Sequence, residues 1–145
     1  MRTALAAALL AAVLPAAAQK LPLESIQLPP GFRIELLAAV PGARSLALGA
    51  RGTLFVATRS GGAVYAVTSG KKVARIASGL HLPNGVAFRA GALYVAEVSR
   101  ILRYDGIEER LESPPQQVVV FDRLPSETHH GWKFIRFGPD GNLYV

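Results

Sequence analysis

The histidines are the residues best able to do acid–base chemistry in this chain. His81 lies in a loop ahead of an apolar run, and we interpret it as a loop histidine. His129 and His130 are adjacent and stand just before the apolar segment 134–137. An unperturbed imidazole has a pKa of about 6.5, so its neutral form can accept a proton near neutral pH. Because neighbouring residues in an extended segment point to opposite sides, we expect only one of the pair to face a ligand.

Asn84 is the second residue of interest, in the sequence Pro83-Asn84-Gly85 at the start of another apolar run. An asparagine there can stabilise a turn through its own backbone. Because it stands at the start of a predicted strand, its amide is also a candidate for ligand contact. The chain has no cysteine, which excludes a thiolate metal site and a disulfide framework. We assign no metal ligand within this chain.

An internal repeat defines the elements that must position these residues. Each copy reads as a short apolar strand, a turn ending in glycine and a second strand of the form Leu-aromatic-Val. The copies are 45–57, 84–96 and 134–145. The turn glycines Gly52, Gly91 and Gly141 are 39 and 50 residues apart, which is typical of four-stranded propeller blades. A β-sandwich also alternates short strands with glycine turns, but the regular spacing favours the propeller.

The first two copies also carry their remaining strands, predicted at 63–67, 73–76, 100–104 and 118–121. The polar segment 105–117 is an insertion that explains the longer second spacing. The predicted fold is therefore all-β, a β-propeller truncated to two blades and the beginning of a third. We expect this partial propeller to occupy residues 45–145 and a lead-in segment to occupy residues 19–44.

Residues 1–18 have the features of a cleaved signal peptide. A positive start precedes the apolar run 4–14, and three alanines stand before Gln19. The apolar run is shorter than the roughly 18 to 20 residues that cross a bilayer. We therefore expect a periplasmic or secreted protein with no membrane span after cleavage.

The charge of the chain argues against nucleic-acid binding. Sixteen basic and ten acidic residues give a formal net charge of +6. The basic residues are scattered along the chain rather than gathered into a stripe with aromatic residues between them.

Residues 129–141, His-His-Gly-Trp-Lys-Phe-Ile-Arg-Phe-Gly-Pro-Asp-Gly, resemble the loop and strand of soluble sugar dehydrogenases that use pyrroloquinoline quinone. The resemblance is to the sorbosone dehydrogenase-like branch, and it covers the N-terminal part of such a protein. It extends back through 100–105, 93–97 and 82–88 to the opening segment 28–34.

The resemblance implies a six-bladed propeller that holds the quinone over the channel mouth with calcium beside it. It implies that His130, eight residues before Gly138, is the general base that takes the sugar hydroxyl proton while hydride passes to the quinone. His129 would contact substrate and Asn84 the cofactor. Glucose dehydrogenases of the family carry an aspartate at the position of His129, which suggests another sugar. The calcium ligands and most quinone contacts would lie on later blades.

The function implied is oxidation of a sugar or sugar aldehyde, sorbosone-like or aldose-like, with electrons passed to an external acceptor. Two alternatives remain open from the sequence. Pro-Asn-Gly before an apolar strand also resembles gluconolactonase-like propellers, in which Asn84 would bind calcium, although segment 40–48 lacks the acidic residue those enzymes place in their first blade. The other alternative is a non-catalytic propeller that binds a protein or a cell-wall sugar.

Overall fold

The computed structural model describes residues 21–145, and the predicted signal peptide lies outside them. The chain divides into a unit that ends at Glu35 and a second unit, Leu36–Val145. The described part of the first unit contains one 3-10 turn, η1 (Leu23–Ser25), and its side chains are largely exposed. The second unit carries all the strands among the described residues.

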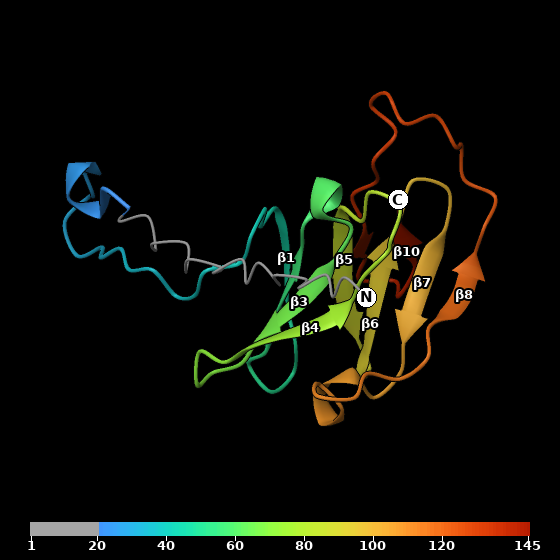
Figure 1. Cartoon of the computed structure of the whole chain (residues 1–145), viewed down its shortest axis with the longest axis horizontal. Coiled ribbons are helices and arrows are strands. Elements are labelled where there is room, and N and C mark those ends of the chain that lie inside the picture. Colours follow the sequence, from blue (N-terminus) through green and yellow to red (C-terminus); the bar gives the residue numbers. More distant parts are fainter. Residues whose placement is uncertain (1–20) are drawn as a thin grey trace, which may run out of the picture. The chain divides into compact units, whose positions relative to one another are not determined.

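The second unit contains two four-stranded antiparallel sheets and one hairpin (Figure 1). The first sheet has the order β1 (Ser45–Leu48), β2 (Leu54–Ala57), β3 (Val64–Val67) and β4 (Val73–Ala77). The second has the order β5 (Gly85–Arg89), β6 (Ala92–Ala96), β7 (Ile101–Tyr104) and β8 (Val118–Phe121). The hairpin consists of β9 (Arg136–Phe137) and β10 (Leu143–Tyr144). Two further 3-10 turns are η2 (Arg59–Gly61) and η3 (Ile107–Glu109).

Glycine turns set the register of the repeated hairpins. Arg89 pairs with Ala92, so β5 and β6 are joined by two residues, Ala90 and Gly91. Both have positive φ, 49° and 79°. A two-residue type I′ turn needs positive φ at both positions, and its twist matches that of the flanking strands. Glycine adopts this region without the steric cost that a side chain brings. The third copy uses Gly141, at φ 85°, in the turn between β9 and β10.

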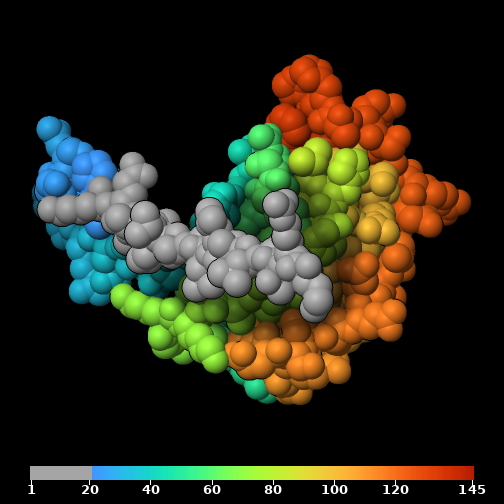
Figure 2. All heavy atoms as spheres, viewed as in Figure 1, coloured from blue at the N-terminus to red at the C-terminus, as the bar shows by residue number. Residues whose placement is uncertain are grey.

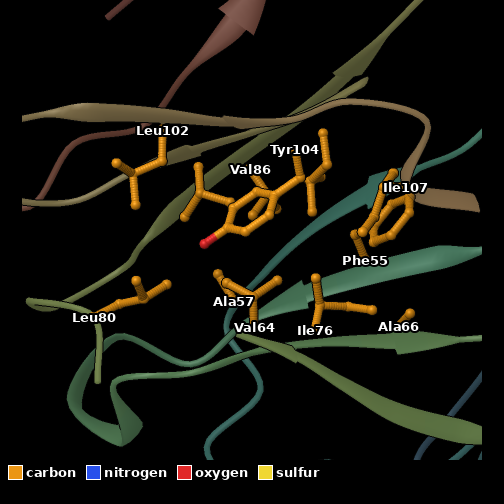
Figure 3. Packing of buried hydrophobic residues seen from close by; sticks show 12 residues of the cluster. Phe55, Ala57, Val64, Ala66, Ile76, Leu80, Val86, Leu102, Tyr104 and Ile107 are labelled. Atoms are coloured by element: carbon orange, nitrogen blue, oxygen red, sulfur yellow. The ribbon is translucent and has the colours of Figure 1, made fainter. Parts of the chain in front are cut away.

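The core lies between the two four-stranded sheets (Figure 3). Phe55, Val64 and Ile76 of the first sheet pack against Leu102 and Tyr104 of the second. Burial of the Tyr104 phenol raises its pKa to about 12, because burial disfavours the charged form. A second cluster, Ala87, Ala96, Ile101 and Ile135, joins the β9 region to the second sheet.

The arrangement is that of a β-propeller, as the repeat predicted: successive four-stranded sheets pack face to face, and each begins with an inner strand. The inner strands β1 and β5 lie side by side, and β9 contacts β5. Strand β8 is the outer edge of the second sheet, and all four of its apolar side chains are 40–47% exposed. Within residues 21–145 there is no helix of the length and apolar character that a bilayer crossing requires.

Candidate functional site

Loops from both sheets and the third hairpin gather at one end of the second unit, the upper end in Figure 1. Backbone hydrogen bonds tie each loop to the next. The Arg59 N–H donates to the Pro83 carbonyl at 2.7 Å, and the Leu80 N–H donates to the Gly62 carbonyl at 3.0 Å. The Leu124 N–H donates to the Ser99 carbonyl at 3.0 Å. This end of the unit is therefore one connected surface, which we call the loop face.

All three histidines lie in loops of the loop face, and all three are exposed. In Figure 2 the loop before β9, in orange-red, rises above the loop before β5, in yellow-green. His129 and His130 stand in this raised loop. The His130 ring lies 5.5 Å from the Trp132 ring, centroid to centroid.

The expectation that His129 and His130 point to opposite sides is wrong. Their ring centroids are 4.3 Å apart in an edge-to-face arrangement. The segment is a turn rather than an extended strand: the Gly131 N–H donates to the Thr128 carbonyl at 3.4 Å, and His130 has φ 55°. The left-handed conformation at His130 interrupts the alternation of side chains that an extended strand imposes, and the two imidazoles lie against each other.

Asn84 joins the entry points of the three inner strands. It is only 5% exposed. Its Oδ1 accepts a hydrogen bond from Arg44 Nε at 2.8 Å, and its Nδ2 donates to the Lys133 carbonyl at 3.0 Å. Arg44 directly precedes β1, Asn84 directly precedes β5, and Lys133 lies just ahead of β9. The Asn84 side chain therefore connects segments that are far apart in the sequence, rather than stabilising the turn that contains it.

The surroundings of Asn84 disfavour calcium at this residue. A guanidinium group already occupies one lone pair of Oδ1, and a divalent cation on the same oxygen would be repelled by it. Within residues 21–145 no cluster of three or more His, Asp or Glu side chains could hold a metal ion. The cofactor contact implied for Asn84 remains a prediction.

Gly85 permits the close approach that the Asn84 bridge needs. A Cβ at this position would lie 2.8 Å from both the Ile135 nitrogen and the Lys133 carbonyl oxygen. Both contacts are with backbone, which cannot rotate away. The segment that follows His130 is therefore seated directly on the start of β5.

Two arginines that the sequence analysis did not single out complete the loop face. The Arg59 Cζ lies 4.6 Å from the Trp132 ring centroid and the Arg44 Cζ lies 5.9 Å from it. Such distances are typical of cation–π contacts. Their partners are far away in sequence, so no local pattern indicated the contact.

Glu97 is a buried carboxylate beneath the loop face. It is 1% exposed, accepts a hydrogen bond from the His81 N–H, and pairs with Arg100 through its other oxygen. The hydrogen bond to Glu97 raises the pKa of Arg100. Glu97 therefore fixes the loop before β5 from below.

We predict that Glu97→Ala destabilises the full-length protein by about 1 to 3 kcal/mol, because it leaves buried polar groups without a partner. Glu109→Ala is the matched control. It also removes a carboxylate paired with an arginine, but both of those side chains are more than 60% exposed. The control should change stability by no more than about 0.5 kcal/mol. Chemical denaturation measures both, and equal effects would contradict the structural role of Glu97.

Comparison with known proteins supports the fold. No family model matches the chain, and neither does any curated protein. Among solved structures, an oxidoreductase described as a glucose dehydrogenase from Thermus thermophilus is similar at a TM-score of 0.64 and 23% identity. The match covers 79% of this chain and 40% of that one.

Two further solved structures are similar. The PQQ-bound aldose sugar dehydrogenase of Streptomyces coelicolor matches at a TM-score of 0.56 and 23% identity, over 72% of this chain and 37% of its own. Virginiamycin B lyase from Staphylococcus aureus matches at a TM-score of 0.52 and 15% identity, over 70% and 33%. At these identities the similarity establishes the propeller fold. The chain spans less than half the length of each of these structures.

Proposed function

We propose that the protein containing this chain is a sugar dehydrogenase that uses pyrroloquinoline quinone, with His130 as the general base. The observation that carries the proposal is the position of the His130 imidazole: exposed on the loop face, beside Trp132, at the entry to an inner strand. The motif at 129–141 supports this reading. So does the fold shared with the PQQ-bound aldose sugar dehydrogenase.

The described residues fit part of what such a cofactor needs. When bound, the quinone supplies the acceptor for a hydride from the sugar carbon. Asn84 retains one N–H and one lone pair for a further contact. Within residues 21–145, no group of three or more His, Asp or Glu side chains could hold the calcium.

His130 performs the proton transfer in this proposal. Hydride leaves a carbon readily only when the proton of the attached hydroxyl is removed in the same event, and a neutral imidazole nitrogen can accept that proton. Because the ring is exposed, the proton can pass to water before the next turnover. His129, with its ring against His130, would contact the substrate. The Asn84 bridge to the Lys133 carbonyl holds the loop that carries both rings.

We further propose a sorbosone-like or aldose-like substrate, an external electron acceptor, and a periplasmic or secreted location that follows from the predicted signal at residues 1–18. The gluconolactonase alternative is disfavoured by the guanidinium on Asn84 Oδ1.

Reconstitution of the full-length protein tests the proposal. With added quinone and calcium, the protein is expected to bleach an artificial electron-accepting dye when aldoses or sorbosone are supplied. Omission of the quinone should abolish the signal. Hydrolysis of a sugar lactone without quinone would contradict the proposal and favour the lactonase, and absence of both activities would favour a binding protein.

A further inference from the structure

Two guanidinium groups on the loop face converge on one aromatic ring without an acidic partner. Arg59 lies over Trp132 at 4.6 Å and Arg44 at 5.9 Å. Within residues 21–145 neither arginine forms an ion pair. Lys133 follows Trp132 in the chain, and its ammonium donates to the Gly131 carbonyl.

The acidic residues of the surrounding loops do not neutralise this cluster. Glu97 is buried and already paired with Arg100. Asp122 and Glu127 are exposed, and neither forms an ion pair with Arg44 or Arg59. Like charges held together raise the energy of the folded protein unless an anion binds between them. The cluster therefore has the electrostatics of an anion site.

The donors of the two arginines are available to a ligand. Arg44 uses Nε for Asn84 Oδ1, and its two Nη groups make no hydrogen bond in the described part of the chain. The side chain of Arg59 makes no hydrogen bond there either. A guanidinium presents paired N–H groups that match the two oxygens of a carboxylate.

We propose that Arg44 and Arg59, both in cation–π contact with Trp132, form a subsite for the carboxylate of an acidic sugar. This inference rests on the proposed function, because it places the acidic sugar beside His130, whose ring is 5.5 Å from that of Trp132. Arg44 is exposed, while Arg59 and Trp132 are partly exposed. Such an open surface suits a substrate that enters and leaves in every turnover better than a cofactor that stays enclosed.

The indole contributes the second half of the recognition. It holds both guanidinium groups close to one another through cation–π contacts, so that together they face the charged substituent of the sugar. The expected substrate class is a hexuronate, which carries a carboxylate where an aldose carries a hydroxymethyl group. Oxidation of its C1 hydroxyl removes two electrons and two protons: hydride goes to the quinone and the hydroxyl proton goes to His130.

Glucuronate and glucose form the matched substrate pair, since they differ only at C6. The full-length protein loaded with quinone and calcium should show a higher kcat/KM for glucuronate. Arg59→Gln should lower kcat/KM for glucuronate by about 10- to 100-fold, the value of a charge-assisted hydrogen-bonded pair. The kcat/KM for glucose should stay roughly unchanged. Arg59→Lys should restore part of the preference, because it keeps the charge and loses the paired donors.

Arg75→Gln is the control for general charge loss. Arg75 is an exposed arginine on β4, away from the loop face, and its removal should leave the glucuronate preference intact. An equal loss of preference in both variants would overturn the subsite.

Calorimetry separates failure of the subsite from failure of the proposed function. The cofactor-free full-length protein should bind glucuronate more tightly than glucose, and both added salt and Arg59→Gln should weaken this binding. If no sugar is oxidised but this binding pattern holds, the dehydrogenase proposal fails and the subsite stands. Equal binding of the two sugars overturns the subsite. A loss of quinone affinity in Arg59→Gln with an unchanged glucuronate-to-glucose ratio overturns it as well and assigns the arginines to the cofactor.

Discussion

Replacement of His130 by asparagine is expected to lower kcat/KM for sugar oxidation by about 10² to 10⁴, the usual contribution of a positioned general base. Asparagine is the appropriate substitution because His130 has φ 55°, a conformation that asparagine tolerates better than most residues. The turn should therefore keep its conformation, so the loss of kcat/KM can be attributed to the missing imidazole. Steady-state kinetics of the quinone-loaded full-length protein measures it, with most of the change expected in kcat.

His81→Asn is the matched control for the His130 variant. His81 is also an exposed histidine on the loop face, and its contact with Glu97 is made by the backbone N–H, which the substitution keeps. Its activity should be close to that of the unaltered protein. If His130→Asn is as active as His81→Asn, the imidazole is not the base.

Gly85→Ala is expected to destabilise the protein by about 1 to 3 kcal/mol, the typical penalty for an added methyl group in a well-packed site. The new Cβ would meet backbone atoms of Lys133 and Ile135 at 2.8 Å, so the strand entry and the segment before β9 must separate. That separation strains the hydrogen bond from Asn84 to Lys133, and amide exchange of residues 131–135 should accelerate. Chemical denaturation and hydrogen exchange of the full-length protein measure the two effects.

Gly70→Ala provides the control for a glycine without such contacts. A Cβ at Gly70 would meet only the Thr68 hydroxyl at 3.8 Å, an ordinary contact. This change should be neutral or should stabilise the protein by up to about 1 kcal/mol, because alanine reduces the conformational entropy of the unfolded chain. If the two alanine variants have the same stability and exchange rates, the segment after His130 does not depend on close packing against the start of β5.

The strands were predictable because their signals are local. Each blade repeats an apolar strand, a glycine turn and a Leu-aromatic-Val strand, and the structure places β1–β2, β5–β6 and β9–β10 on these segments. The outer strands at Val64–Val67, Val73–Ala77, Ile101–Tyr104 and Val118–Phe121 also fall where the sequence predicted them. Alternating apolar residues and turn glycines act over a few positions, so a linear reading captures them.

The loop face was only partly predictable. The sequence marked His129, His130 and Asn84, but the Arg44–Asn84 hydrogen bond joins residues 40 positions apart, and the Asn84–Lys133 bond spans 49. These contacts depend on how one sheet packs against the next, which no short pattern encodes. The relation between the two histidine rings was mispredicted for a local reason. His130 adopts a left-handed conformation, so the segment forms a turn where an extended strand entry was expected.

The exposed outer strand β8 favours self-association of the protein at high concentration. Its valines and phenylalanine are accessible, and within residues 21–145 no other strand pairs with its outer edge. Such an edge offers free N–H and carbonyl groups to any other extended chain. Self-association through this edge would obscure both catalysis and stability, so kinetics, calorimetry and denaturation require dilute protein whose monomeric state has been checked by light scattering.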